Sequence, residues 1–180
     1  MPTGALRSPS ARRLRPRLLR QALARPHRRG NQILERAAAA GIPVCVFDSA
    51  VNFADYVTFV ATDNFAAGGQ AAREIGRLLQ GRGSVAMVMQ KPGGAPTGLR
   101  ERGFVETLER EFPAVRLVAR QFGMGDRARD RAADANILTA LAGLQAMFGS
   151  SEAATIGIIR AVERRDRAGQ IKIVSSRRRP

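Results

Sequence analysis

The sequence predicts an α/β fold with a mostly parallel sheet and helices on both of its faces. Short apolar runs rich in β-branched residues alternate with segments of helical periodicity, and the connections between them are short. The polar loops after residues 47, 89, 122 and 148 all follow predicted strands. They therefore meet at the carboxyl edge of the sheet, where open α/β sheets bind ligands.

The stretch 41–64 is the part around which the rest is organised. Its apolar run from Ile42 to Phe47 is typical of a fully buried strand, and Cys45 in the middle is expected to be a buried thiol. Asp48 and Ser49 stand at the tip of that strand. A second apolar run, 57–61, follows and completes the pair of strands.

Helical segments flank this stretch. A helix over 31–40 ends at Gly41, a residue suited to a helix C-cap, and Asp63 is placed to cap the helix that follows. Gly68 and Gly69 lie inside that second helix, where they cost stability, so we expect close packing against another helix.

The remaining elements alternate regularly. A Gly/Pro loop over 90–98 precedes a helix over 99–112, in which Leu99 is expected to point inward and Arg100 and Arg102 stand in the first turn. Basic residues there oppose the helix dipole, a local conflict of the kind found at functional sites. A helix over 152–166 is expected to bury Ile159. The other predicted elements are strands at 85–89, 115–122, 144–148 and 171–174 and a helix at 126–141.

The net charge of +15 is concentrated at the two ends. Residues 1–30 carry nine Arg and no acidic residue, and residues 177–179 are three further Arg. The remaining 18 Lys and Arg stand against 15 Asp and Glu, so the body has a net charge of only +3. Basic tails can bind polyanions in a salt-dependent way, but this distribution gives no reason to expect specific nucleic-acid binding.

The usual signs of catalysis and metal binding are missing from the sequence. The single His is His27 in the basic end, and no HExxH, Cys pair or GxSxG occurs. We therefore expect neither an enzyme nor a cofactor. No apolar run approaches 18 residues, so no membrane span is expected. What remains is Asp and Arg at strand tips, and charge-assisted hydrogen bonds from such groups suit carbohydrate hydroxyls.

Five segments resemble one family in order and spacing. They are ERAAAAGIPVCVFDS, FVATDNFAAGGQAA, RERGF, GDRARDRA and LQAMFGSSEAATIGIIRAV. Together they are similar to periplasmic sugar-binding proteins of ribose-binding type, which serve ABC transporters and share their fold with the effector domains of lactose-repressor-type regulators. The resemblance implies a monosaccharide ligand, a pentose or hexose, and an ABC transporter permease as partner. A sugar-responsive repressor core is the alternative.

The resemblance also implies the domain organisation and the site. Residues 31–61 would be the remnant of a first α/β domain and 62–174 a second domain, flanked by a disordered Arg-rich extension (1–30) and a basic tail (175–180). The resemblance implies sugar contacts at the following positions: Asp48, Arg102, Ser151, Ser49 and Gly125. Arg is frequent in the family where Ser49 stands, and an aromatic residue is frequent where Gly125 stands.

The two ends depart from the family pattern. An Arg-rich segment stands where the family has its first strand, and Ser-Ser-Arg-Arg-Arg-Pro follows Val174. From this we expect a form truncated at both ends, with impaired sugar binding and ends that read like out-of-frame translation. The resemblance implies a periplasmic location. Residues 1–30 lack the apolar region of a signal peptide, so the chain as it stands is expected to be cytoplasmic.

Overall fold

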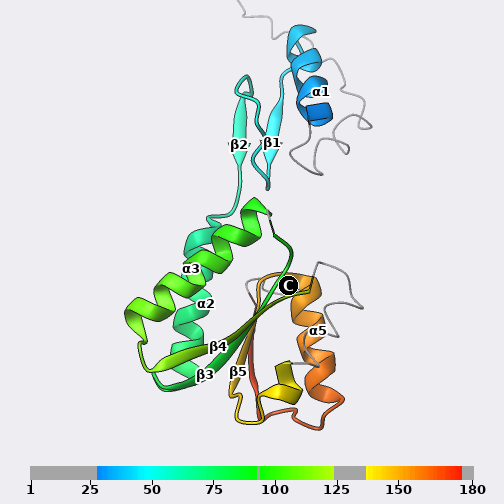
Figure 1. The fold of residues 1–180 in the computed structure, drawn as a ribbon. Helices are drawn as coiled ribbons and strands as arrows, with labels where there is room; N and C mark the ends of the chain where they lie inside the picture. The colour runs from blue at the N-terminus through cyan, green and yellow to red at the C-terminus, as the bar shows by residue number, and fades with distance from the viewer. Residues whose placement is uncertain (1–27, 93, 124–136, 176–180) are drawn as a thin grey trace, which may run out of the picture. The chain divides into compact units, whose positions relative to one another are not determined.

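The computed structural model describes residues 28–92, 94–123 and 137–175. The chain divides between Val60 and Ala61 into two compact units (Figure 1). The first unit contains α1 (Arg28–Ala39), β1 (Cys45–Phe47) and β2 (Thr58–Val60). The second unit contains α2 (Asn64–Leu78), β3 (Gly83–Met89), α3 (Ala95–Glu111), β4 (Val115–Phe122), β5 (Ala146–Gly149), α5 (Glu152–Glu163) and β6 (Lys172–Ser175).

Helix α1 ends as the sequence predicts. Gly41 adopts a left-handed conformation with φ +68, which its lack of a Cβ permits. The backbone N–H of Ile42 donates to the carbonyl of Ala37 at 3.0 Å, and that of Gly41 donates to Ala38 at 2.8 Å. These two bonds satisfy carbonyls that the last helical turn would otherwise leave without partners.

The first unit corrects the expectation of a fully buried strand. β1 and β2 form a parallel pair in which Val46 lies opposite Phe59. Val46 is buried, but Cys45 is exposed and Phe47 is 48% exposed. All three residues of β2 are exposed. The apolar run predicted a strand with sheet neighbours on both sides and cover on both faces, whereas the described residues of this unit give each strand one neighbour.

The second unit has a four-stranded parallel sheet in the order β4-β3-β5-β6. β3 lies beside β4, the next strand in the sequence, and also beside β5, which follows β4. The chain thus adds strands first on one side of β3 and then on the other. The carboxyl ends of β3 and β5 therefore form the point at which the strand order reverses, the usual ligand position in this class of sheet.

Both faces of this sheet are covered, as the sequence predicts. Val85 and Met87 of β3 join one buried apolar cluster with residues of α2 and α3, whereas Ala86 and Val88 join a second cluster with residues of α5. Figure 1 shows the two helices on one side of the sheet and α5 on the other. Because successive strand residues point to opposite faces, burial of both faces explains the unbroken apolar run of β3.

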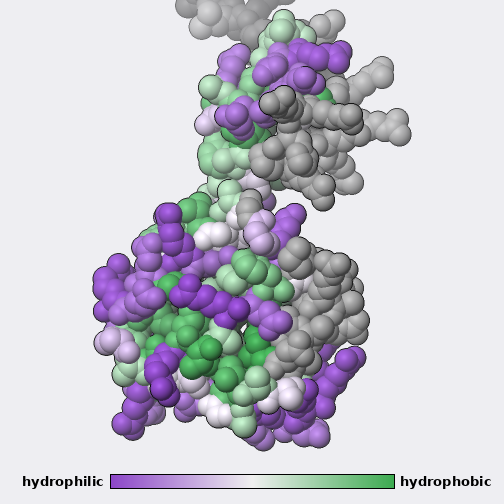
Figure 2. Space-filling model, in the orientation of Figure 1, coloured by the Kyte–Doolittle hydropathy of each residue, from purple (hydrophilic) through white to green (hydrophobic). Residues whose placement is uncertain are grey.

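Helices α2 and α3 pack with their backbones in contact. A Cβ added to Gly68 would collide with the backbone of Arg100 and Phe104, and one added to Gly103 would collide with the backbone of Phe65. The glycines inside α2 are therefore explained by close helix packing, as predicted. Figure 2 shows hydrophilic surface over much of the outer side of this helix pair, which suits helices that cover a sheet.

Helix α3 begins earlier than the sequence predicts. It starts at Ala95 rather than Leu99, with Pro96 in its first turn. Proline has a backbone angle that suits this position, and its missing N–H costs nothing there. Arg100 and Arg102 consequently lie beyond the first turn. The expected conflict with the helix dipole, which falls off within that turn, is wrong.

Two predicted core positions are also wrong, each by a small error in helical phase. Leu99 and Ile159 are exposed. In α5 the buried positions are Ala154, Ile158, Ala161 and Val162, whose spacing places Ile159 at the edge of the buried stripe.

The predicted cap of α2 is confirmed: the Asp63 carboxylate accepts from the backbone N–H of Ala66 at 2.9 Å. The helix predicted over 126–141 lies largely outside the described residues.

An exposed ion-pair cluster joins α2 to the end of α3. The Arg73 guanidinium donates two hydrogen bonds to Glu111, each of 2.8 Å, and Arg110 donates a third of 2.9 Å. Arg73, followed by Arg110, holds the pKa of the Glu111 carboxyl well below its ordinary value, at about 2. Because this pKa is lowered in the folded state, its contribution to stability is present above the ordinary carboxyl pKa and is lost as pH falls toward 2.

This cluster gives a direct titration prediction. In Arg73→Ala the pKa of Glu111 is expected to rise toward the ordinary carboxyl value, because the strongest of its partners is gone. Carbon-detected NMR of the Glu111 side chain measures this. Arg110→Ala is the matched control and should raise the same pKa by less. An unchanged Glu111 titration in Arg73→Ala would contradict the two-point ion pair.

Candidate functional site

The candidate site lies at the carboxyl edge of the second unit's sheet, where the strand order reverses. Gln90 is the first residue after β3, and Ser150 and Ser151 are the first residues after β5. Helix α3 begins a few residues beyond Gln90 and brings three consecutive charged residues, 100–102, to this part of the unit. The sequence and the topology thus place charge next to two neighbouring strand tips.

The Glu101 carboxylate ties these two strand tips together. Its Oε1 accepts from the backbone N–H of Gln90 at 3.2 Å and from the hydroxyl of Ser150 at 2.6 Å. Ser150 is completely buried. Because a buried hydroxyl without a partner is costly, the short bond to a carboxylate is a strong constraint on where α3 lies against the sheet.

Arg100 extends the cluster to helix α2. Its Nη1 donates to the Ser150 carbonyl at 2.7 Å and its Nη2 donates to Asn64 Oδ1 at 2.6 Å. Asn64, which is also buried, donates through Nδ2 to the carbonyl of Thr62 at 3.0 Å. Hydrogen bonds therefore run from the entry of the second unit to the tip of β5.

Arg102, one of the predicted sugar contacts, has a different environment. Its side chain is 63% exposed and lies 3.5 Å from Glu106. The guanidinium also stands over the ring of Phe65 at 5.4 Å, a favourable cation–π distance. The contacts with Phe65 and Glu106 partly orient the Arg102 guanidinium. Because a guanidinium has five N–H donors and this side chain is exposed, donors are still available to a ligand.

Ser151 begins helix α5. Its hydroxyl accepts from the backbone N–H of Ala154 at 3.3 Å, so it acts as the helix N-cap. Glu152 in the first turn is favourable for the helix dipole. The Ser151 hydroxyl that is predicted to contact sugar therefore also caps the helix. The capping hydrogen bond fixes the direction of the hydroxyl oxygen.

Asp48 and Ser49 belong to the first unit. Asp48 follows β1 directly and adopts φ +66, a conformation that Asp tolerates better than most residues. Its backbone N–H donates to the Val60 carbonyl at 2.9 Å, and the Ser49 hydroxyl lies 3.5 Å from its carboxylate. The Asp48 side chain is exposed at the end of its strand.

The structure therefore brings Arg102 and Ser151 next to one polar cluster and places Asp48 and Ser49 at one strand tip of the first unit. Gly125 lies outside the described residues. The sequence alone does not reveal that Arg100 and Ser150 are hydrogen-bonded to each other. Arg100 precedes buried Phe104 by four residues, so the predicted helix over 99–112 already places the two on one face.

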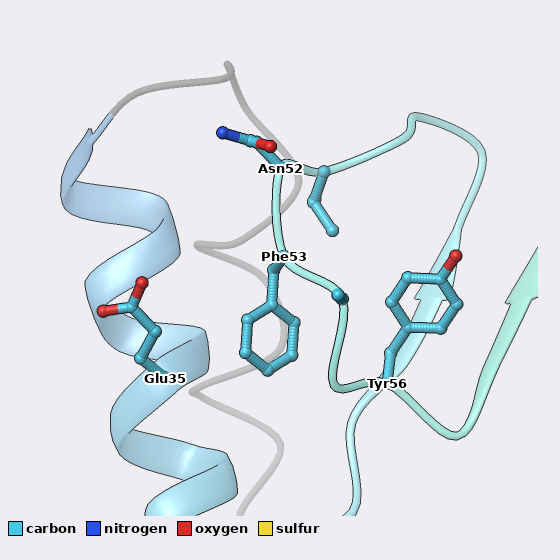
Figure 3. A pocket seen from close by; sticks show the side chains of 6 residues that line it. Glu35, Asn52, Phe53 and Tyr56 are labelled. Atoms are coloured by element: carbon cyan, nitrogen blue, oxygen red, sulfur yellow. The ribbon is translucent and has the colours of Figure 1, made fainter.

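A separate hollow of about 550 Å³ lies in the first unit, between α1 and the loop before β2 (Figure 3). Figure 3 labels four of the lining residues, Glu35, Asn52, Phe53 and Tyr56. Val51 and Ala54 also line the hollow. None of the predicted sugar contacts that the structure describes lines it. Among the described residues no group of three His, Cys, Asp or Glu side chains is placed to hold a metal ion.

No helix in the described ranges is both long and apolar enough to cross a membrane.

Comparisons with known proteins point to one family. The chain is 28% identical over 129 residues to the ribose import binding protein of Bacillus subtilis. This alignment covers 72% of the chain and 41% of that protein. It therefore spans less than half of that relative's length.

Solved structures agree with this match. A sugar-binding protein of a sugar ABC transporter from Bacillus halodurans is 34% identical with a TM-score of 0.74, covering 79% of this chain and 49% of that one. The arabinose binding protein of Geobacillus stearothermophilus is 30% identical with a TM-score of 0.75, covering 81% and 49%. The sequence profile of the periplasmic binding protein domain matches residues 27–177, and the chain belongs to that family.

Proposed function

We propose that the chain is the carbohydrate-binding component of a sugar ABC importer and takes a monosaccharide. One observation supports this: Glu101 and Ser150, the chain neighbours of Arg102 and Ser151, are hydrogen-bonded at the reversal point of a parallel sheet, in a chain whose relatives include ribose- and arabinose-binding proteins. A reversal point edged by hydrogen-bonding groups suits a ligand rich in hydroxyls. A permease is the proposed partner, and an extracytoplasmic location follows from the family.

The proposed contacts divide by chemistry. The Asp48 carboxylate accepts from sugar hydroxyls and the Arg102 guanidinium donates to them, so each forms charge-assisted hydrogen bonds. Ser49 and Ser151 add hydroxyls, and Gly125 leaves no ring for stacking at its position. The role proposed for these groups is to bind and orient the sugar, and no catalytic step is proposed.

Transport is favoured over the regulator alternative. The relatives named above include an import binding protein and a sugar-binding protein of a sugar ABC transporter. The fold alone does not decide between the two roles, because the same architecture serves both. The basic ends are proposed to take no part in sugar recognition.

We further propose that these 180 residues bind sugar weakly when taken alone. They span about half the length of the solved relatives, so only part of the usual set of hydrogen-bonding groups comes from this chain. At about 0.5–1.5 kcal/mol per hydrogen bond, a few missing bonds lower the affinity by orders of magnitude. A dissociation constant near 1 mM, equivalent to about −4 kcal/mol, is the expected order.

Ligand-observed NMR tests this function, because it detects millimolar binding. The 180-residue protein is expected to show saturable binding of at least one pentose or hexose, such as D-ribose or L-arabinose, with little dependence on salt. Absence of saturable binding for every pentose and hexose tested would overturn the proposal. Binding of single-stranded DNA that weakens steeply with salt, with no sugar binding, would instead support a role for the basic ends.

A further inference from the structure

We propose that Glu101 is a positioning residue for the sugar site, one that sets the place of Arg102 and Ser151 without touching the sugar. This inference rests on the proposed function. Its basis is the position of one carboxylate oxygen between two strand tips. Glu101 Oε1 accepts from Gln90 after β3 and from Ser150 after β5.

The two proposed contacts are chain neighbours of the two ends of this bridge. Arg102 follows Glu101 on α3, and Ser151 follows Ser150 at the start of α5. The 2.6 Å bond between Glu101 and the Ser150 hydroxyl therefore limits how far the two contacts can move apart. A shift of α3 along the sheet would move Arg102 relative to Ser151.

Arg100 provides a second link to the same turn. It donates to the Ser150 carbonyl, while Glu101 accepts from the Ser150 hydroxyl, so consecutive residues of α3 hold the carbonyl and the hydroxyl of one buried serine. Through Asn64 the same Arg is joined to the carbonyl of Thr62. A polar cluster with members on α2 and α3 and directly after β3 and β5 specifies one arrangement of these elements more than it adds to stability.

The affinities for two epimeric sugars distinguish a positioning role of Glu101 from a general contribution to stability. Loss of stability lowers the fraction of folded protein and weakens binding of every sugar by the same factor. A displaced Arg102 changes hydrogen bonds with particular hydroxyls and so changes the ratio of affinities for two epimers. D-ribose and D-arabinose differ only at C2 and make a suitable pair.

Four forms of the 180-residue protein test this inference: wild type, Glu101→Ala, Glu101→Gln and the control Glu109→Ala. Glu109 is on the same helix, and its ion-pair partner is Arg120 at 3.8 Å. Glu101→Ala is expected to weaken sugar binding about tenfold and to change the ribose-to-arabinose ratio about threefold. Glu101→Gln keeps an acceptor oxygen, so it and the control should retain the wild-type ratio.

Two sugar-free measurements separate this inference from the proposed function. Glu101→Ala should speed amide exchange at Gln90 and shift the side-chain Nε signal of Arg102, and Glu101→Gln should restore both. Equal loss for both epimers, no rescue by Gln, or an unchanged Gln90 exchange would overturn the positioning role. If wild type binds none of the pentoses and hexoses tested, the proposed function fails, and the exchange and Arg102 measurements alone decide the positioning role.

Discussion

Replacing Gly68 by alanine is expected to destabilise the second unit by at least about 3 kcal/mol, and larger side chains should prevent its folding. The new Cβ would lie 2.8 Å from the Arg100 carbonyl carbon and 2.8 Å from the Phe104 nitrogen. These are backbone atoms of α3, which cannot rotate away as a side chain can. Chemical denaturation followed by circular dichroism measures the loss.

Gly98 provides the matched control for this experiment. It lies within α3, and a Cβ added there meets nothing within 4 Å. Gly98→Ala is therefore expected to leave stability unchanged or to raise it by up to about 1 kcal/mol, because alanine is the better helix former. A Gly68→Ala protein as stable as Gly98→Ala would contradict the close backbone contact between α2 and α3.

The layered fold could be predicted because its signals are local. Continuous apolar runs identify strands that are buried on both faces, and helical spacing identifies the segments that cover them. β4 has the predicted bounds, Val115–Phe122, and Asp63 caps α2 as expected. These features depend on residues within a few positions of each other.

The wrong predictions for the start of α3 and for the burial of Cys45 have a common cause. Both properties depend on the surrounding structure, which the local sequence does not show. The 90–98 segment contains four Gly and Pro residues between 92 and 96, which predicts a loop throughout, whereas α3 begins at Ala95 with Pro96 in its first turn. The apolar run around Cys45 predicts a buried thiol, whereas Cys45 is exposed because β1 has a single neighbouring strand in the described residues. Neither property can be obtained from local composition.

The candidate site could be predicted only in part. Arg102 stands out because of its charge and its motif; its side chain is 63% exposed, and its contact with ligand stays a prediction. Ser150 and Asn64 do not stand out, because a small polar residue in a turn has many possible roles. Their importance comes from bonds to Arg100 across 50 and 36 positions of sequence, which no spacing rule reveals.

Arg102→Ala is expected to reduce sugar affinity by about tenfold to a hundredfold, since it removes charge-assisted hydrogen bonds worth about 1.5–3 kcal/mol. Arg102→Lys should recover only part of this, because an ammonium lacks the planar pair of donors. Both variants should fold normally, given the exposure of the side chain. Arg116→Ala, at an exposed position near the opposite end of β4, is the control and should bind as wild type.

The most direct test is residue-resolved NMR of the isotope-labelled 180-residue protein during titration with D-ribose or L-arabinose. We expect saturable shifts at the Arg102 side chain and at the backbone amides of Ser151 and Asp48, with one shared dissociation constant. Shifts confined to the Arg-rich ends, or none at these three residues with sugar at about 50 mM, well above the expected millimolar constant, would contradict a sugar site built from these strand tips.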